Sequence, residues 1–408
     1  MRWFYNIAIK GYCFLIRICS LRNKKAQKWI DGRKDIFRRL QETITPGEPL
    51  LWFHASSLGE FEQGRPVIEA IKKKKPEYKI LLTFFSPSGY ELRKNYPYAD
   101  YVFYLPLDTR KNAVRFLDIV RPEKAFFIKY EFWYNFLTEL KRRQIPTYIF
   151  SALFRPSQLF FKPWGKWYRK ALLAFDTIFV QNQESYLILH QYGFNNVQIC
   201  GDTRLDAVGE IADAAPRLEK MEQFCGNQKP IIAGSTWKED EDLFIHFINE
   251  SNAGQKFVVA PHEVNAQSIE RITNALCKSY VLYSKATKEE LAQSEVLIVD
   301  GYGYLISVYR YGLFAYVGGG FTDGIHSILE PAAFGLPVIF GPDYHKFQEA
   351  HDLLKLGAAN SVTDYQGLNS VFNKYLSNQQ SLSSASNIAL NYVNKNRGAS
   401  EHIVKHLF

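Results

Sequence analysis

The sequence contains few cysteines and no long uncharged apolar run, and both absences narrow the class of protein. Its five cysteines are widely spaced, and none forms a Cys-x-x-Cys pair. This pattern argues against a disulfide framework or a structural zinc site, and it is typical of a chain kept in a reducing compartment. No uncharged apolar stretch approaches the roughly 18 residues of a confident membrane span.

Common nucleotide-binding and hydrolase motifs are also missing. The sequence has no Gly-x-Gly-x-x-Gly fingerprint, Walker A loop or Gly-x-Ser-x-Gly elbow, so it does not predict the usual NAD, ATP or α/β-hydrolase sites. It lacks RNP-type patterns, zinc fingers and basic-region helices, and we expect no nucleic-acid partner. His345 and His351 are six residues apart, which does not place two metal ligands on one helix face, so no metal site is predicted.

The composition shows a surplus of aromatic residues and of positive charge. The 408 residues include 31 Phe and 25 Tyr, and the formal net charge is +9. The length predicts two domains, and 47% hydrophobic with 22% charged residues is the composition of a folded protein. Amphipathic aromatic residues and excess cations favour partners such as a membrane interface, an acidic lipid or a phosphorylated substrate.

Residues 1–28 are predicted to form a membrane-associated helix. One stripe of this helix consists of Asn6, Lys10, Cys13 and Arg17. The rest of its circumference is mostly apolar, which is typical of a helix that lies in a bilayer interface. A basic cluster follows, consisting of Arg22, Lys24, Lys25 and Lys28. Such a cluster favours the cytoplasmic side of the membrane and anionic lipid. A buried first helix and a tilted single span are the alternatives.

After residue 48, short apolar runs alternate with amphipathic stretches in two successive series. The first series of predicted strands covers 49–56, 78–85, 100–108, 124–132, 146–153 and 176–182. The second covers 230–236, 255–262, 280–286, 295–301, 313–320 and 337–342. Helices are expected between them, for example over 60–75 and 133–143. This alternation predicts two Rossmann-like domains with parallel sheets, at 29–205 and 206–408, with a polar linker over 206–229.

Glu60 is the first candidate for chemistry, because it directly follows the first predicted strand in the run His54-Ala-Ser-Ser-Leu-Gly-Glu60. A carboxylate at the carboxyl end of a parallel strand is placed where such sheets bind ligands, and it can act as a general base. The alternative is an ordinary acidic residue in the first turn of a helix, whose dipole would favour the ionised form and limit its basicity.

Two loops of the second half are candidates for binding phosphate. Gly318, Gly319 and Gly320 lie between a predicted strand and a helix, where backbone N–H groups can hold a phosphate, and Glu330 follows one turn into that helix. The run 233–238 brings hydroxyls and a lysine to another helix start, with simple N-capping as the alternative. The acidic run 240–242 is interpreted as a solvated helix face.

Taken together, these runs resemble the Kdo transferases (3-deoxy-D-manno-oct-2-ulosonic acid transferases) of lipopolysaccharide assembly. The resemblance covers nearly the whole chain and rests on the order and spacing of several motifs. These are Gly32-Arg33-Lys34, HASSLGE (54–60), LTFFSPSGYE (82–91), YLPLD (104–108), YEFWYN (130–135), GDTRLD (201–206), AGSTWKEDE (233–241) and the long run 316–342.

The resemblance implies a GT-B fold in which two Rossmann-like domains face a central cleft. It implies an inverting, metal-independent transfer from CMP-Kdo to a lipid A precursor, at the cytoplasmic face of the inner membrane of a Gram-negative cell, with no cofactor. Glu60 matches the catalytic base, and Glu131 matches a second catalytic acid. The implied donor-binding residues are Ser235, Thr236, Lys238, His262, Gly318, Gly319, Gly320, His326, Ser327 and Glu330. The implied acceptor-binding residues are Ser56, Ser57, Gly59 and Arg155.

The sequence departs from the family pattern at three places. Lys129 stands where Glu is usual, Tyr134 stands where Pro is usual, and the family's Pro-Arg-His reads Ala260-Pro-His262, so an arginine is missing. The hypothetical substitutes for its charge are Lys238, Arg204 and Lys346. The aromatic stretch 159–164 is expected to support acyl chains, with a buried helix start as the alternative. Two other functions stay open at this point: a GT-B enzyme with a different sugar nucleotide, and a lipid- or nucleotide-binding protein without turnover.

Overall fold

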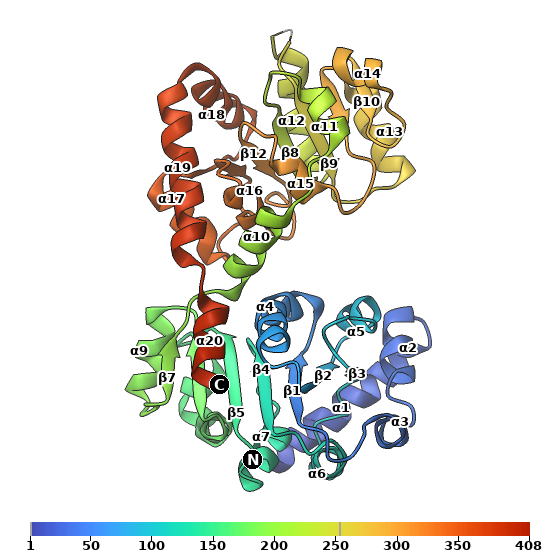
Figure 1. Ribbon diagram of the computed structural model, residues 1–408, viewed down its shortest axis with the longest axis vertical. Coiled ribbons are helices and arrows are strands. Elements are labelled where there is room, and N and C mark those ends of the chain that lie inside the picture. Colours follow the sequence, from blue (N-terminus) through green and yellow to red (C-terminus); the bar gives the residue numbers. More distant parts are fainter. Residues whose placement is uncertain (1, 253) are drawn as a thin grey trace. The chain divides into compact units, whose positions relative to one another are not determined.

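The computed structural model describes residues 2–252 and 254–408, which form two compact units. The first unit comprises Met1–Ala207 together with Arg397–Phe408, and the second comprises Val208–Asn396. Each described unit contains a seven-stranded parallel sheet with helices on both faces (Figure 1). The prediction of two Rossmann-like α/β halves is therefore confirmed.

The first sheet has the strand order β3-β2-β1-β4-β5-β6-β7, which reverses direction at β1. Its strands are β1 Leu50–Ala55, β2 Lys79–Phe84, β3 Tyr101–Tyr104, β4 Lys124–Ile128, β5 Thr147–Ala152, β6 Thr177–Val180 and β7 Val197–Ile199. Its helices are α1 Arg2–Ser20, α2 Lys24–Asp31, α3 Ile36–Thr43, α4 Leu58–Lys74, α5 Pro87–Arg93, α6 Arg110–Val120, α7 Tyr134–Arg142, α8 Lys166–Arg169 and α9 Gln183–Gln191, with the 3₁₀ turns η1 Leu159–Phe161, η2 Pro163–Gly165 and η3 Lys170–Ala174. Ligands of such sheets bind at the carboxyl ends of the strands beside the point of reversal, which is where β1 ends.

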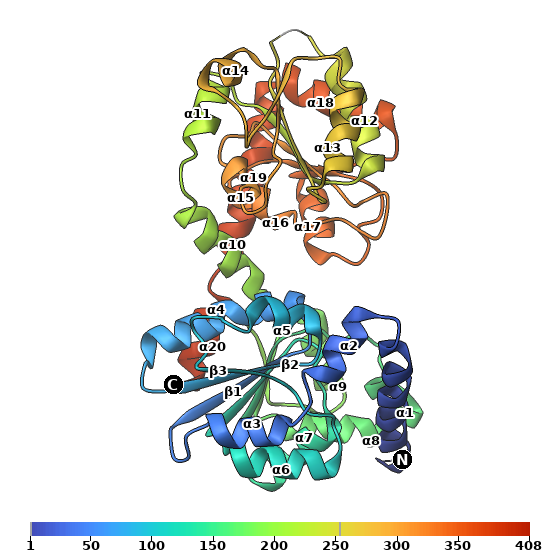
Figure 2. The ribbon, with the colours of Figure 1, turned by 90° about the vertical axis from the view of Figure 1, so that its right-hand side faces the viewer.

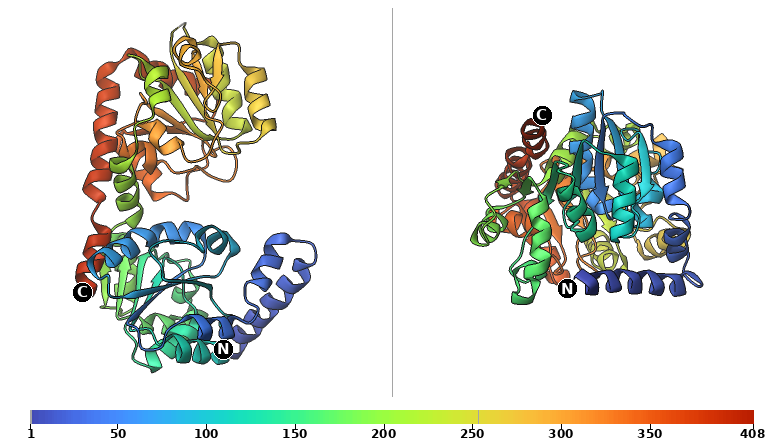
Figure 3. Two further views of the ribbon diagram at one scale, coloured as in Figure 1. Left: turned by 45° about the vertical axis from the view of Figure 1, so that its right-hand side comes forward. Right: turned by 90° about the horizontal axis from the view of Figure 1, so that it is seen from below.

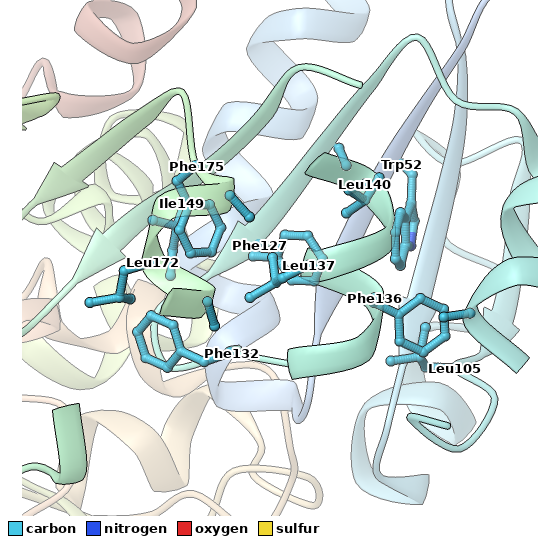
Figure 4. Packing of buried hydrophobic residues seen from close by; sticks show 14 of the residues in the cluster. Trp52, Leu105, Phe127, Phe132, Phe136, Leu137, Leu140, Ile149, Leu172 and Phe175 are labelled. Carbon is cyan, nitrogen blue, oxygen red and sulfur yellow. The ribbon is translucent and has the colours of Figure 1, made fainter. Parts of the chain in front are cut away.

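The strands of the first sheet are apolar on both faces because each face is covered by helices (Figure 2). On one face, Trp52 lies against Phe116, Phe127 and Phe136, with ring centroids 4.8, 5.3 and 5.6 Å apart (Figure 4). Each such side chain contributes about 1.5–3 kcal/mol on burial. This aromatic layer fixes β1, and with it the loop that follows β1.

The second sheet has the order β10-β11-β9-β8-β12-β13-β14. Its strands are β8 Ile231–Thr236, β9 Phe257–Pro261, β10 Tyr280–Leu282, β11 Val296–Ile298, β12 Ala315–Val317, β13 Val338–Phe340 and β14 Ala359–Ser361. The helices from the linker onward are α10 Thr203–Ala214, α11 Glu219–Cys225, α12 Lys238–Glu250, α13 Ala266–Ala275, α14 Lys288–Gln293, α15 Leu305–Tyr309, α16 Leu329–Ala333, α17 Gln348–Leu356, α18 Tyr365–Ser377, α19 Gln379–Asn396 and α20 Ala399–Leu407. All twelve predicted strands are present, whereas β7 and β14 were not predicted.

The last helix, α20, differs from the predicted division of the chain at 206, because it belongs to the first unit. Its apolar residues Ile403, Val404 and Leu407 join the core formed by β1, β2 and α4. The start of α20 is held by Asp206, whose carboxylate accepts hydrogen bonds from the backbone N–H groups of Gly398 and Ser400. The C-terminal residues therefore complete the first sheet's cover rather than the second's.

Replacing Asp206 by Ala is expected to lower the free energy of unfolding of the first unit by about 1 kcal/mol. The substitution removes the acceptor for two N–H groups at a helix start, which is the usual effect of losing an N-cap. Chemical denaturation would measure the change, with Asp213→Ala at an exposed position of the same helix, α10, as the control. An unchanged midpoint for Asp206→Ala would show that α20 docks by its apolar residues alone.

Helix α1 lies along the surface of the first unit (Figure 3), and its outward side exposes apolar residues such as Trp3, Phe4 and Phe14. The inward side is fixed by Tyr5, whose hydroxyl donates to Asp108 Oδ2 at 2.6 Å, by Asn6, which accepts from Asn135 Nδ2 at 3.0 Å, and by buried Cys13. The predicted stripe of Asn6, Lys10, Cys13 and Arg17 is thus split: Asn6 and Cys13 face the protein, while Lys10 and Arg17 stay exposed. Within residues 2–252 and 254–408, no helix has both the length and the apolar character of a membrane span.

Candidate active site

Glu60 lies at the start of α4, directly after β1, and its carboxylate folds back onto the β1–α4 loop. Oε2 accepts hydrogen bonds from the backbone N–H groups of Ser56 at 2.6 Å and Ser57 at 3.3 Å. Burial raises the pKa of Glu60 to about 8, and the neighbouring Glu131 carboxylate adds to the rise, although both N–H donors oppose it. The expectation that a helix start would limit the basicity of Glu60 is therefore wrong, because burial and a like charge outweigh the helix terminus.

Glu131 is brought next to Glu60 by the loop that follows β4, the strand paired with β1. Its carboxylate is buried and lies 3.0 Å from His54 Nε2, and it accepts a hydrogen bond from Trp133 Nε1. The other ring nitrogen, His54 Nδ1, lies 2.9 Å from Thr83 Oγ1. Residues of the adjacent strands β2 and β1 thus orient the Glu131 carboxylate, which follows β4. The carboxyl groups of Glu60 and Glu131 share one partly buried site.

The predicted acceptor-side residues lie around this pair of carboxyl groups. Ser56 and Ser57 donate their backbone N–H groups to Glu60, and Gly59 is exposed on the first turn of α4. Arg155 is exposed after β5, and its charge acts on the Tyr130 hydroxyl together with the charges of Arg204 and Glu60. The structure therefore gathers the predicted residues of the first half at one edge of the first sheet.

In the second unit, the Gly-rich loop after β12 is held by Asp240. Asp240 Oδ2 accepts from Gly319 N at 2.9 Å and from Trp237 N at 2.9 Å, and Oδ1 accepts from the Tyr316 hydroxyl at 2.7 Å. A Cβ atom on Gly318 would lie 2.4 Å from Ser235 O, so only glycine fits there. The loop is consequently built around a carboxylate and has no room for side chains.

The interpretation of residues 240–242 as a solvated face is wrong for two of the three residues. Asp240 and Glu241 are buried, and only Asp242 is exposed, where it pairs with Lys238 at 2.7 Å. Glu241 pairs with Arg271 at 2.7 Å and accepts from the Thr236 hydroxyl. Asp240 and Glu241 therefore hold the ends of β8 and β12 in place through hydrogen bonds.

Three rings stack at the carboxyl ends of β8, β9 and β12. Trp237 stacks on His262 with centroids 4.7 Å apart, and His262 stacks on His326 with centroids 4.3 Å apart. Trp237 Nε1 donates to His326 Nε2 at 3.0 Å. Burial lowers the pKa of His326 to about 4, with a further contribution from His262, so the His326 ring is neutral at physiological pH.

The remaining predicted donor-side residues border this stack. Ser235 adopts a left-handed backbone (φ 53°) at the irregular end of β8, and Thr236 is buried beside it. Ser327 is exposed just before α16, and Glu330 lies in the first turn of that helix. Of the proposed substitute cations, Lys238 and Lys346 are exposed in this unit, whereas Arg204 forms an ion pair with Asp202 in the first unit.

Comparisons with known proteins show which proteins the chain resembles. The family model described as 3-deoxy-D-manno-octulosonic-acid transferase (kdotransferase) matches residues 32–207. The 3-deoxy-D-manno-octulosonic acid transferase of Aquifex aeolicus is 28% identical over 330 residues, which cover 79% of this chain and 84% of that protein. The enzyme of the same name from Chlamydophila psittaci is 27% identical over 321 residues, covering 76% and 73%. The chain is therefore similar to Kdo transferases over most of its length. It is a glycosyltransferase.

Solved structures show that the chain has the GT-B fold. The UDP-GlcNAc 2-epimerase of Neisseria meningitidis superposes with a TM-score of 0.63 at 16% identity, covering 88% of this chain and 99% of that one. MurG of Acinetobacter baumannii superposes with a TM-score of 0.55 at 12% identity, covering 88% and 98%. At such low identity the likeness concerns the fold alone.

Sequence reasoning did not assign roles to His54 and Trp133, which organise the candidate site of the first unit, or to Asp240, which organises that of the second. His54 is a fully buried polar residue at the end of an apolar strand, and that position is itself a signal, since buried polar groups need partners. Asp240 offered no such signal, because an acidic residue in the first turn of a helix is common without any tertiary role.

Proposed function

We propose that this protein transfers Kdo from CMP-Kdo to a lipid A precursor of the lipid IVA type, with inversion at the anomeric carbon and without a metal ion. The observation that carries the mechanism is the position of Glu60 at the end of β1 with a pKa raised to about 8, which suits a general base at physiological pH. The transferred sugar is the one in the names of the relatives that span most of the chain. The CMP-linked donor and the lipid A acceptor are those that the resemblance to Kdo transferases implies.

In the proposed reaction, Glu60 takes the proton of an acceptor hydroxyl as its oxygen attacks the anomeric carbon of Kdo. The bond between that carbon and the phosphate oxygen of CMP breaks, and the bonding electrons leave with CMP. A single displacement of this kind inverts the anomeric centre. Glu131 is the second carboxyl group of the site; it keeps the proton affinity of Glu60 high, and its own position is set by His54 and Trp133.

The donor is proposed to bind the carboxyl edge of the second sheet. The loop 318–320 is proposed to lie against the leaving phosphate, with the backbone N–H group of Gly320 and the Ser235 hydroxyl as donors that stabilise developing negative charge. The N–H groups of Gly318 and Gly319 and the Thr236 hydroxyl already donate to Gly234 O, Asp240 Oδ2 and Glu241 Oε1, and so they shape the loop. Lys238 and His262 contribute cationic or hydrogen-bonding groups, and the carboxylate of Glu330 suits the ribose hydroxyls. The acceptor side then consists of Ser56, Ser57, Gly59 and Arg155 around Glu60.

We also propose that the outward face of α1 binds the cytoplasmic surface of the inner membrane. This face consists of Trp3, Phe4, Ile7, Ala8, Gly11, Phe14, Leu15 and Ile18. Trp3, Phe4, Phe14 and Leu15 are each more than 60% exposed. Exposed apolar side chains along a single helix face, next to basic residues, are typical of a helix lying in a bilayer interface.

Replacing Phe14 by Gln is expected to weaken binding to neutral phospholipid vesicles about 10-fold, because one large apolar side chain contributes about 1.5 kcal/mol or more on leaving water. Sedimentation with the vesicles would measure the change. Tyr280→Gln is the control, since Tyr280 is an exposed aromatic residue of the second unit. Equal losses in the two variants would argue against membrane contact through α1.

The transfer itself is tested with purified protein, a lipid A precursor and either CMP-Kdo or a UDP-sugar, each with and without EDTA. Product from CMP-Kdo alone, unaffected by EDTA, is the expected result. If the UDP-sugar gave product instead, the donor in this proposal would have to be a UDP-sugar rather than CMP-Kdo. Donor binding without product from either nucleotide would favour a binding protein without turnover.

The rate should rise with pH through about 8. Glu60 is protonated below its raised pKa and becomes a base above it, so kcat/KM of the proposed transfer follows the ionised fraction. Glu131→Gln removes the neighbouring negative charge, which lowers the pKa of Glu60 and moves the midpoint of the profile to lower pH. The exposed Glu184→Gln is the control. A midpoint that stays in place in Glu131→Gln would show that burial alone sets the pKa.

A further inference from the structure

A basic pocket lies beside α1 in the first unit, apart from the carboxyl groups of Glu60 and Glu131. Its volume is about 460 Å³, and its walls are the flank of α1, the α2–α3 connection, the loop after β3 and α6. Its basic residues are Arg17, Arg33, Lys34, Arg38 and Arg115, against one carboxylate, Asp35. A concave site with this excess of one charge attracts an anion.

Arg33 carries a charge that no carboxylate among the described residues balances. Its guanidinium donates to the carbonyl oxygens of Leu105 at 2.9 Å, Trp29 at 3.0 Å and Phe85 at 2.7 Å. Burial lowers the pKa of Arg33 to about 9, and the groups that oppose this effect are Tyr104, Tyr12 and Cys13, not an acid. A partly buried cation with neutral partners is costly, and an anion in the same pocket would compensate it.

The other cations of the pocket form only exposed ion pairs or none. Lys34 pairs with Asp31 at 2.7 Å, where both side chains are exposed. The Arg115 guanidinium lies over the Phe37 ring, 4.5 Å from its centroid, and the described residues form no ion pair with Arg115 or Arg17. Arg38 reaches Asp35 at 3.7 Å and Glu42 at 3.9 Å, and the Arg38 side chain is 68% exposed. Exposed pairs at such distances contribute little, so these guanidinium groups are free to bind another anion.

The position of the pocket suggests where that anion comes from. Arg17 and Cys13 line the pocket from the flank of α1, and Arg17 is followed by Ile18 on the outward apolar face. A molecule whose acyl chains lie along this apolar face would therefore bring its headgroup to the pocket. An anionic group attached to a lipid matches both features at once.

Aromatic side chains separate the pocket from the proposed reaction centre. Trp29 forms part of the pocket wall and packs against Phe85, with centroids 5.5 Å apart; Phe85 in turn packs against Trp133 at 4.7 Å. Trp133 is the side chain that donates to Glu131. A layer of aromatic rings thus separates the occupant of the pocket from the acceptor hydroxyl that Glu60 would activate.

We infer that this pocket binds the phosphate headgroup of an anionic membrane glycerophospholipid, distinct from the acceptor, and that this contact holds the first unit at the membrane surface. The inference rests on the proposed contact of α1 with the membrane. Guanidinium groups suit this role because they bind phosphate oxygens in pairs.

The test compares binding of the full chain to phosphatidylcholine vesicles with and without phosphatidylglycerol. Arg38→Gln/Arg115→Gln is expected to lose about 25-fold in affinity for the anionic vesicles, since each cation at such a surface contributes about 5-fold. Arg110→Gln/Lys111→Gln removes the same charge from exposed positions of α6 outside the pocket and should lose much less. Neutral vesicles should bind both variants and the wild type equally.

Each other outcome overturns the inference in a recognisable way. Equal losses in the two double variants would mean diffuse attraction without a site. A loss seen only when a phosphorylated acceptor is placed in neutral vesicles would assign the pocket to the acceptor, and full competition by inorganic phosphate would remove the lipid requirement. Failure of every form to bind neutral vesicles would instead count against the proposed role of α1.

Discussion

Glu60→Gln is expected to lower kcat of the proposed Kdo transfer by about 10³-fold with little change in donor affinity. A positioned base contributes roughly 10²–10⁴-fold to such a reaction. The amide of Gln can still accept the hydrogen bond from Ser56 N that Glu60 Oε2 accepts at 2.6 Å, so the β1–α4 loop keeps its conformation, but the amide cannot take a proton. Steady-state transfer to a lipid A precursor would measure the loss.

The control for this substitution is Glu77→Gln, which removes one exposed carboxylate from the turn between α4 and β2. Thermal unfolding of both variants should match the wild type or lie slightly above it for Glu60→Gln, because a carboxyl group with a raised pKa opposes folding once it is ionised. Substantial turnover by Glu60→Gln would assign the base to another group, with Glu131 the nearest candidate.

The strand ends that carry the site were predictable because buried parallel strands consist of continuous apolar runs in the sequence. The run that ends at Ala55 and the run that ends at Val317 are both followed by small residues, and both proved to be strands with functional loops. Strands β7 and β14 were missed because each has only three residues with polar members, and they lie at the edges of their sheets.

Features that depend on contacts distant in sequence were not predictable. The periodicity of α1 identified a helix with an apolar face, but Asn6 faces the protein only because Asn135 is there to donate to it. The position of α20 likewise depends on distant contacts. The C-terminal residues pack in the first unit, where the Asp206 carboxylate accepts a hydrogen bond from Ser400 N. The raised pKa of Glu60 depends on burial and on Glu131, which is 71 residues away in the sequence.

Asp240 is the clearest case of a residue whose role only the folded chain reveals, and its removal should have the largest effect on the second unit. The carboxylate is fully buried and accepts three hydrogen bonds, from Trp237 N, Gly319 N and the Tyr316 hydroxyl. Burial raises its pKa even though all three donors lower it, so desolvation opposes folding at this position. In return for that cost, the hydrogen bonds of Asp240 fix the Gly-rich loop to the end of β8.

Asp240→Ala is expected to reduce the free energy of unfolding by about 3 kcal/mol, because it leaves buried donors without an acceptor. It should also raise the KM for the nucleotide donor, since Gly319 would no longer be held. Asp240→Asn should be milder: its amide oxygen can serve Trp237 N and Gly319 N, while its NH₂ group donates to the Tyr316 oxygen.

Asp242→Ala, one exposed carboxylate further along α12, is the control for charge. Denaturant unfolding and donor titration would measure the two effects separately. Equal behaviour of Asp240→Ala and Asp242→Ala would show that the loop keeps its shape without this carboxylate, and the phosphate-binding role proposed for residues 318–320 would then need another source of rigidity.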